Sequence, residues 1–563
     1  MATLSTKLYL IVILLAIFSC AGKKDRHFES ELKSINLKQG DITLCGAADG
    51  KFGTVEFTVS CLDKVRGNFN LATALLHSFE YDEAEKVFAK VINEDPACVM
   101  AYWGVAMSNF HALWSPQGQA DLKKGSKAIA LARSLNQKSK RESDYLDAVA
   151  AFYVDWDKFD HKTRCLRFEK AMESVYQKYP QDKEAAIFYA LALNATAVPS
   201  DKSFINQRKA GEILKNLYPN EPNHPGIAHY IIHTFDYPEL AELALPMARK
   251  YASVAPASAH AQHMPSHIFT RLGLWDESIG SNLASISAAQ CYAANIKMNG
   301  HWDEELHGMD YLTYAYLQEG NDTKAKKQLD LLRSYRSSVN NNKVAYVFAA
   351  IPARYALERK HWSEATKLEV FPSNFPWDKF LWEKAITHFA KGLGYVNTHD
   401  ITGANIEVKE LKSIHERLTK VRDAYQASYK ADQVLVQIKS IDAWIHLAGG
   451  RKEQALGLMT QAADMEDATE KSSVTPGEVI PARELLADMY MEIGETTNAL
   501  KAYEADLQRH PNRFNGLYGA ASAEQKLGNN EKAGNYFRQL LRIAHPTNSK
   551  RPELMAAIKF VKD

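Results

Sequence analysis

The sequence lacks several features that would place it in a common class of proteins. Its 68 Lys and Arg residues nearly balance 67 Asp and Glu residues, so the chain has no global basic field and we expect no nucleic-acid partner. Beyond residue 18, no apolar run is long enough to cross a bilayer, which excludes a multi-span membrane protein. An apolar fraction of 46% over 563 residues also excludes a disordered or collagen-like chain.

Motifs of the common enzyme classes are missing as well. The sequence contains no Walker-type glycine loop, no GxSxG, no HExxH and no Rossmann fingerprint. Its 6 cysteines are too few for a disulfide-stapled miniprotein, and no CxxC pair indicates a thiol redox motif or a zinc knuckle. The sequence alone therefore leaves open whether the protein is an enzyme.

The N-terminus has the pattern of an export signal. Lys7 precedes an apolar run over residues 8–18, which has the length of a signal-peptide core. The segment Ile-Phe-Ser-Cys that ends at Cys20 resembles a lipoprotein cleavage box, which predicts attachment of lipid (palmitate) to Cys20. An ordinary cleaved signal peptide is the alternative. We expect a lipid-anchored protein of the cell envelope, at the outer membrane or cell surface.

Two cysteines flank a segment with turn and strand character. Cys45 and Cys61 enclose the glycine-rich residues 46–53 and the β-favouring residues 54–59. In an oxidising compartment this pattern predicts a small hairpin closed by a Cys45–Cys61 disulfide, with two unpaired cysteines as the alternative. The remaining cysteines lie in helical patterns and are predicted to be core residues: Cys98, Cys165 and Cys291.

The rest of the chain repeats a helix–turn–helix pattern. Gly494 precedes Ala499 by five residues, and Gly528 precedes Ala533 in the same way, one period of 34 residues later. This spacing resembles the tetratricopeptide repeat, in which Gly serves the turn and Ala lets two helices approach closely. The pattern recurs at Ala84, Gly273 with Ser278, Gly320 with Ala325, Trp362 with Ala365, and Gly450 with Ala455. We predict an all-α solenoid of stacked helix pairs.

The predicted organisation has five parts. They are a signal peptide (1–19), a linker with the hairpin (20–64), an N-terminal repeat array (65–345), central helical repeats (346–470) and a C-terminal repeat pair (471–563).

Histidines concentrate in one window of the sequence. Eight of the 19 fall within residues 224–307, where an even distribution would place about three. Spacings of four residues put His229 with His233, and His263 with His267, on single helical faces, where two imidazoles can reach one metal ion. These four are the candidate ligands for zinc, copper or iron. Pro265 either kinks the second helix or starts it, and histidines that fill polar niches between helices are the alternative.

A second set of residues is predicted to line a ligand groove. His307 precedes Gly320 by 13 residues, as His260 precedes Gly273, so the two occupy equivalent positions in neighbouring repeats. His77 and His111 are 34 residues apart and are equivalent in the same sense, although an inter-repeat packing layer would give the same spacing. The predicted groove residues are His77, His111, Trp114, His224, His260, His307 and Asp310.

Seven motifs resemble a family of exported bacterial tetratricopeptide-repeat proteins. They are Cys45-Gly-Ala-Ala-Asp-Gly, Leu75-Leu-His-Ser-Phe, Ala101-Tyr-Trp-Gly, His224-Pro-Gly-Ile-Ala-His-Tyr, His263-Met-Pro-Ser-His267, His307-Gly-Met-Asp-Tyr-Leu and Ile480-Pro-Ala-Arg-Glu-Leu. The likeness covers nearly the whole mature chain and implies that the histidine motifs are family features, but it supplies no reaction. A cleavage box followed by a helical-repeat body also resembles surface lipoproteins that accompany bacterial glycan uptake.

These observations favour a binding function over catalysis. We predict a membrane-anchored scaffold whose concave groove holds a protein segment or a glycan-related ligand, as an accessory to glycan utilisation or to an envelope complex. A metal-dependent enzyme or a metal carrier that uses the histidines of residues 224–307 is the alternative prediction.

Overall fold

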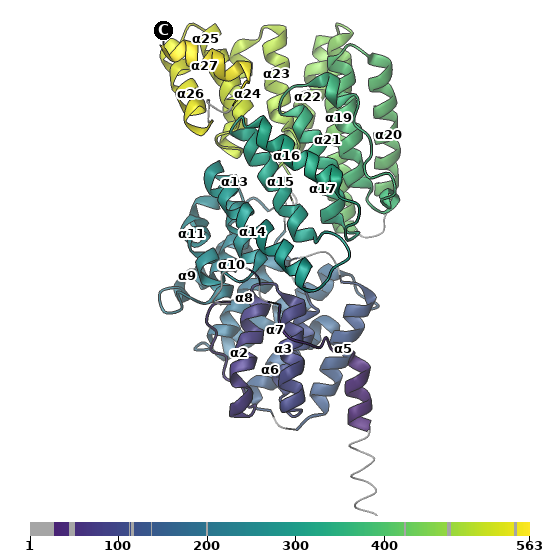
Figure 1. Cartoon of the computed structure of the whole chain (residues 1–563), viewed down its shortest axis with the longest axis vertical. Coiled ribbons are helices and arrows are strands. Elements are labelled where there is room, and N and C mark those ends of the chain that lie inside the picture. The colour runs from purple at the N-terminus through teal and green to yellow at the C-terminus, as the bar shows by residue number, and fades with distance from the viewer. Residues whose placement is uncertain are drawn as a thin grey trace, which may run out of the picture. The chain divides into compact units, whose positions relative to one another are not determined.

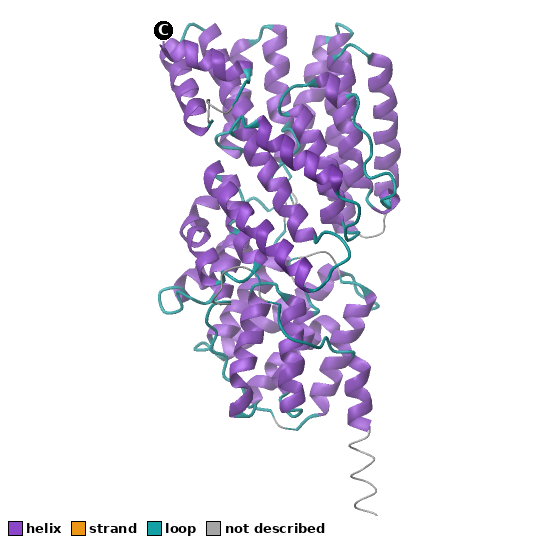
Figure 2. Cartoon of the chain, viewed as in Figure 1, coloured by secondary structure: helices purple, strands orange, loops and turns teal. Residues whose placement is uncertain are grey.

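A computed structural model describes most of the chain after the signal sequence. The described residues are 27–43, 45, 51–111, 113, 117–136, 138–198, 201–420, 424–469, 475–544 and 549–562. Cys20 and Trp114 lie outside them. The described residues are largely helical and include no strand, which confirms the all-α prediction (Figure 2). None of the described helices combines the length and apolar character that a membrane span requires.

The chain divides into two compact units. The first comprises Met1–Thr43, Phe52–Ala197 and Ile205–Tyr230, and the second comprises Leu44–Lys51, Val198–Phe204 and Ile231–Asp563. The helices of the first unit are η1 (Asp63–Val65), α2 (Arg66–His77), α3 (Tyr81–Glu94), α4 (Val99–Ser108), α5 (Gln119–Ser134), α6 (Lys140–Tyr153), α7 (His161–Lys178), α8 (Lys183–Thr196) and α9 (Ile205–Leu217). Helix α10 (Pro225–Thr234) begins in the first unit and ends in the second.

The second unit contains the remaining helices. They are η2 (Ala241–Ala244), α11 (Leu245–Val254), α12 (Ala259–His263), α13 (Pro265–Arg271), α14 (Trp275–Asn295), α15 (Asp303–Gln318), α16 (Asp322–Ser334), α17 (Asn342–Leu357), α18 (Trp362–Ala365), η3 (Trp377–Lys379), α19 (Leu381–Asn397), α20 (Ile401–Thr419), α21 (Ala424–Ala448), α22 (Lys452–Asp467), α23 (Ala482–Ile493), α24 (Thr496–Arg509), α25 (Phe514–Lys526), α26 (Asn530–Ile543) and α27 (Pro552–Lys562).

The predicted repeat pattern is confirmed by backbone and packing. Gly494 follows α23 directly with a φ of 84°, and Gly528 separates α25 from α26 with a φ of 81°, values that L side chains rarely adopt. Consecutive helices pack side by side, as the pairs α23–α24 and α25–α26 show in Figure 1. The alanines predicted at helix contacts are fully buried: Ala84, Ala325, Ala365, Ala455, Ala499 and Ala533. The glycines and alanines that the spacing identified thus lie at the turn and at the helix contact of each pair.

The predicted hairpin over residues 45–61 is wrong. Residues 54–61 do alternate between exposed and buried side chains, with Val55, Phe57 and Val59 buried. However, they form no strand, because side chains of neighbouring helices satisfy backbone N–H groups that a paired strand would have bonded. The pairs are Phe57 with Asn70, Ser60 with Glu142, and Leu62 with Asp95. The period-2 pattern thus reflects an extended segment that packs on helices.

The disulfide pairing also differs from the prediction. Cys45 bonds Cys291 across 246 residues, and Cys61 bonds Cys98 across 37 residues. Cys98 and Cys291 are therefore not simple core residues, as their helical context had suggested. Cys165 is a free, buried thiol as expected, and burial raises its pKa to about 12. The prediction failed because each cysteine bonds a partner on a helix that is distant in the sequence. The spacing of cysteines along the chain does not reveal such a partner.

The core of the second unit surrounds one almost completely buried helix. Residues 344–357 of α17 are all buried, and α17 packs against α15 and α19. A continuous apolar cluster extends from α15 through α17 and α19 to α23. Both sites described next are built against this core.

Candidate functional site

Three of the predicted histidines come together in the second unit. His263 ends α12, Pro265 starts α13, which carries His267, and His307 lies on α15. Pro265 thus starts a new helix, one of the two outcomes that the sequence allowed. Despite this break, one nitrogen from each of the three rings lies within 4.8 Å of the others. We call these residues the three-histidine centre.

Hydrogen bonds fix the orientation of two of these rings. Nδ1 of His263 lies 2.8 Å from Oδ1 of Asn282, whose amide nitrogen donates to a backbone carbonyl and so orients the side chain. Nδ1 of His267 lies 2.9 Å from a carboxylate oxygen of Asp236, and Arg271 donates to the other oxygen. Because both acceptors are oxygens, each ring carries its proton on Nδ1 and presents a lone pair at Nε2.

The two lone pairs point at each other. Nε2 of His263 and Nε2 of His267 are 3.1 Å apart. The ring of His307 lies 4.2 Å from that of His263, between centroids, and its Nδ1 is buried without a hydrogen-bond partner among the described residues. Burial and neighbouring histidines lower the pKa of His263 and of His307 well below the ordinary range. The centre therefore gathers three imidazoles around one point, and the lowered pKa of His263 and of His307 favours the neutral form of these two rings.

Sequence reasoning missed the residues that support this centre. Asp236 and Asn282 reach it from a loop and from α14 through tertiary packing, and no local pattern marks them. Tyr311 does belong to a quoted motif, directly after Asp310. Its hydroxyl donates to the carbonyl of Thr475 at 3.0 Å, and its ring lies beside those of His263 and His267.

A second histidine cluster, in the first unit, is held together by hydrogen bonds to one carboxylate. Glu184 accepts from Nε2 of His77 and from Nε2 of His224, each at 2.9 Å, and Nδ1 of His77 lies 2.9 Å from the hydroxyl of Tyr230. Burial lowers the pKa of His77 despite the nearby carboxylate, which favours the neutral ring. Both Nε2 atoms thus have an acceptor in Glu184, as expected of the polar packing layer that was the alternative prediction for His77. Nδ1 of His224 is buried without a hydrogen-bond partner among the described residues.

The other predicted residues lie in several places. His229 belongs to the first unit, where its Nδ1 donates to the carbonyl of His77 at 2.6 Å. The ring of His233 stacks on that of His260 in the second unit, with centroids 6.2 Å apart. His111 is partly buried against Tyr81. Of the four predicted metal ligands, His263 and His267 thus meet in the three-histidine centre, where they are joined by His307 from the predicted groove set.

Asp310, another residue of that set, is buried completely. Its Oδ1 lies 3.3 Å from Nε of Arg354, while its Oδ2 has no hydrogen-bond partner among the described residues. Burial raises the pKa of this carboxyl to about 6 in spite of Arg354. A residue so enclosed supports the fold around α15 and α17 and does not face an open groove.

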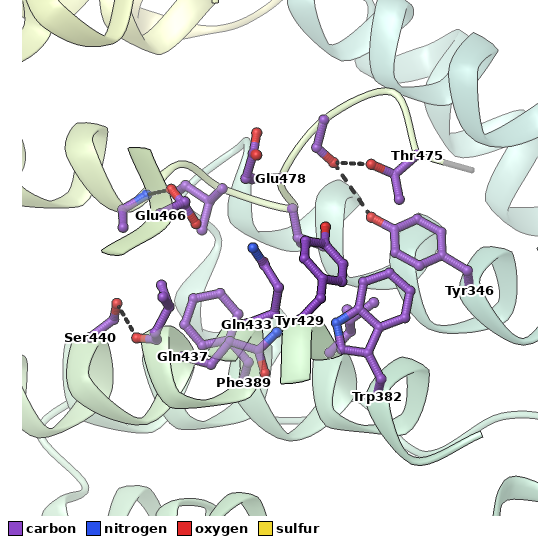
Figure 3. Close-up of a pocket in the computed structure, with 16 residues that line it drawn as sticks. Tyr346, Trp382, Phe389, Tyr429, Gln433, Gln437, Ser440, Glu466, Thr475 and Glu478 are labelled. Carbon is purple, nitrogen blue, oxygen red and sulfur yellow. Dashed lines mark hydrogen bonds between the residues drawn. The ribbon is translucent and has the colours of Figure 1, made fainter. Parts of the chain in front are cut away.

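The second unit also contains a small pocket next to the segment that Tyr311 contacts (Figure 3). The cavity measures about 40 Å³. Its aromatic walls are Tyr346, Trp382, Phe389 and Tyr429, and its polar lining includes Gln433, Gln437, Glu466, Thr475 and Glu478. Thr475 thus contributes to the pocket wall and accepts the hydrogen bond of Tyr311, which connects the pocket to the three-histidine centre.

The polar side of the pocket is rich in hydrogen-bond acceptors. Oε1 of Gln437 is buried and has no partner among the described residues. The Glu466 carboxylate accepts from the backbone N–H of Ala482. Burial, and then the negative charge of Glu478, raise the pKa of Glu466 well above its usual range. The pocket wall therefore carries two neighbouring carboxyl groups, of which Glu466 has the raised pKa.

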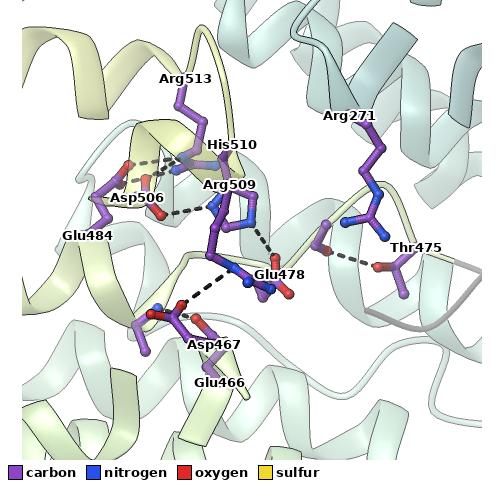
Figure 4. Close-up of polar contacts among 12 residues, drawn as sticks. Arg271, Glu466, Asp467, Thr475, Glu478, Glu484, Asp506, Arg509, His510 and Arg513 are labelled. Atoms are coloured by element: carbon purple, nitrogen blue, oxygen red, sulfur yellow. Dashed lines mark hydrogen bonds and ion pairs between the residues drawn. The ribbon is translucent and has the colours of Figure 1, made fainter. Parts of the chain in front are cut away.

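A buried ion network anchors Glu478 at the pocket wall (Figure 4). His510 bridges Asp506 and Glu478, with its two ring nitrogens 2.8 Å and 3.0 Å from the respective carboxylates. Although burial opposes it, these two carboxylates raise the pKa of His510 to about 10, so the ring is an imidazolium at neutral pH. Nearby, the fully buried Arg513 lies between Glu358 and Glu484.

Among the comparisons with known proteins, the match to a family model supports the repeat fold. No protein with a curated description matches the chain significantly. Human IFIT1, solved as a dimer with m7Gppp-AAAA, is 11% identical with a TM-score of 0.35, over 78% of this chain and 90% of its own. Yeast Tom70 is 12% identical with a TM-score of 0.32, over 89% of this chain and 95% of its own. The family model for the tetratricopeptide repeat matches residues 65–98, which include α2 and α3, so the chain contains at least this one repeat of that family.

Proposed function

We propose that the protein is an exported binding scaffold that captures a positively charged side chain of a partner protein in the pocket of Figure 3. The observation that carries the proposal is a set of acceptor atoms and aromatic rings around a cavity of side-chain size. The tetratricopeptide repeat at residues 65–98 supports it, because stacked helical repeats commonly serve as binding surfaces for other molecules.

The size of the pocket favours a protein segment over a glycan. Its volume of about 40 Å³ is far below the roughly 300–1,000 Å³ of pockets that enclose whole small molecules. A cavity needs roughly 10–15 Å³ of such space to hold one water molecule, so this cavity has room for a few waters or the end of one side chain. Of the two ligand classes expected from the sequence, the protein segment therefore fits this pocket better.

The chemistry of the pocket favours an ammonium group. Gln437, Glu466 and Glu478 offer oxygen acceptors, and an ammonium group is all donor. The rings of Trp382 and Tyr429 complete the wall, and the Trp382 ring already has the ammonium group of Lys430 5.2 Å from its centroid, which shows that it tolerates a cation. A bound cation would also offset the repulsion between the two carboxyl groups and would favour the ionised form of Glu466.

We expect the full chain to bind a hexapeptide with a central lysine, and not the same peptide with norleucine in its place. Glu466→Gln should weaken binding roughly tenfold or more, since it removes a charged hydrogen-bond partner. The matched control is Glu453→Gln, which changes an exposed residue of the same helix, α22. Because the pKa of Glu466 is raised and a bound cation favours its ionised form, affinity should rise with pH. Calorimetric titration measures each value, and equal binding of the norleucine peptide would disprove recognition of the cation.

The proposal includes export and a lipid anchor at Cys20, within an envelope complex. Two disulfides among the described residues support export, because such bonds persist in oxidising compartments. We expect the wild-type chain, expressed in a bacterium that processes lipoproteins, in the membrane fraction, and Cys20→Ser in the soluble fraction. Immunoblots of fractionated cells measure the distribution. Wild-type protein in the soluble fraction would contradict the anchor. Peptide mapping of the Cys45–Cys291 disulfide tests export independently of the anchor, because the bond should form only in an exported chain.

A further inference from the structure

We propose that the three-histidine centre is a metal site that binds one divalent transition-metal ion of the zinc type. The ligands are Nε2 of His263, Nε2 of His267 and a ring nitrogen of His307. The inference is independent of the pocket and its ligand, because it rests on a different set of residues. It also changes the ligand set that the sequence predicted, in which His229 and His233 took the place of His307.

The proton positions on His263 and His267 are the first observation that favours a metal ion. Asn282 and Asp236 hold the Nδ1 protons of His263 and His267, so both Nε2 atoms face each other as lone pairs at 3.1 Å. Two lone pairs at this distance repel unless a cation lies between them. A shared proton would serve these two rings but would leave His307 without a partner for its buried Nδ1. A metal ion can bind all three rings.

The distances fit a tetrahedral ion. Two nitrogens at 2.0–2.1 Å from one zinc ion in a tetrahedron lie about 3.3 Å apart, close to the 3.1 Å between the Nε2 atoms. The nitrogen of His307 lies within 4.8 Å of both and has to approach by rotation of its ring. Imidazole nitrogen is a ligand that suits zinc, copper, iron and nickel.

The surroundings have the form of a metal site's supporting shell. Ligating histidines usually donate their second N–H to a carboxylate or carbonyl oxygen, which fixes the tautomer and the ring plane. Asp236 and Asn282 do this for His267 and His263. The His77–Glu184–His224 cluster is a useful contrast, since its Nε2 atoms already donate to Glu184. Similar residue types therefore place the Nε2 atoms on a carboxylate there and face to face here.

Burial assigns the ion a structural role. The side chains of His263, His267 and His307 are all buried, with residue exposures of 0%, 3% and 5%. They come from the end of α12, from α13 and from α15. The ion would therefore hold α12 and α13, which meet at Pro265, against α15. Tyr311, one turn after His307, holds the carbonyl of Thr475 at the pocket. Loss of the ion should therefore loosen this region.

The test uses the full chain, purified without a histidine tag, incubated with Zn²⁺ or Co²⁺ and dialysed. We expect about one metal ion per chain by elemental analysis and the absorption bands of tetrahedral Co²⁺. His267→Ala and the conservative His307→Gln should lose both signals. Asp236→Asn should keep the site but weaken affinity about 10- to 100-fold. His361→Ala, an exposed histidine outside the centre, is the matched control and should retain the ion.

Folding is monitored in the same samples. A chelator should lower the melting temperature of the wild-type chain and of His361→Ala, and should leave that of a folded His307→Gln variant unchanged. If one variant does not fold, the melting temperature of the wild-type chain with and without metal still tests whether the ion binds. A wild-type chain that binds no ion after incubation, or variants that retain the ion and its Co²⁺ spectrum, would overturn the proposal.

Discussion

Replacement of Arg513 by methionine is expected to lower the free energy of unfolding by about 3–5 kcal/mol. Arg513 is completely buried and donates to the carboxylates of Glu358 and Glu484 at 2.9–3.1 Å. Methionine has a similar volume but no charge, so both carboxylates would lose their partner in a site that water does not reach. Burial already raises the pKa of Glu484 to about 7 while the guanidinium is present.

Urea denaturation of both proteins measures this loss. The control is Arg538→Met, which changes an exposed arginine of α26 and should alter stability by no more than about 0.5 kcal/mol. Adding Glu484→Gln to Arg513→Met should recover part of the stability, because it removes one of the two buried carboxyl groups that have lost the guanidinium. If Arg513→Met were as stable as the control, the ion network would contribute nothing to the fold.

Local features of the fold were accessible from the sequence. Gly494 and Ala499 act within one helix pair, so their spacing alone predicts the turn and the helix contact. The same holds for His263 and His267, which lie four residues apart. His307 was linked to His260 in the same helix region through their equal distances from Gly320 and Gly273, because equivalent positions in neighbouring repeats lie on adjacent helices.

Long-range features were not accessible. Cys45 pairs with Cys291 across 246 residues, and no local pattern records such a partner. Asp236 and Asn282 fix the protons of the three-histidine centre, yet each looks like an ordinary polar residue in its own segment. The hairpin failed for a related reason: alternation of buried side chains indicates an extended segment, but not whether a strand or a row of helix side chains pairs with its backbone.

Raising the pH from 6.5 to 10 is expected to remove several kcal/mol of stability that His510 contributes. Its pKa is raised to about 10 in the folded chain, against an ordinary value of about 6.5, so the folded state holds its proton more tightly than the unfolded state. The contribution is therefore complete below pH 6.5 and is lost as pH rises through the folded pKa. At about 1.4 kcal/mol for each pH unit, the loss approaches about 4 kcal/mol.

The variant His510→Gln isolates this effect from other groups that titrate in alkali. Glutamine can hydrogen-bond to one carboxylate but cannot carry the charge that Asp506 and Glu478 require, so the variant should be less stable than the wild type at pH 6.5. The difference should shrink towards pH 10, whereas His361→Gln, at an exposed site, should follow the wild-type curve. Urea denaturation at a series of pH values measures the difference. A constant gap between His510→Gln and the wild type would mean that His510 stabilises this network by shape and hydrogen bonding, without its charge.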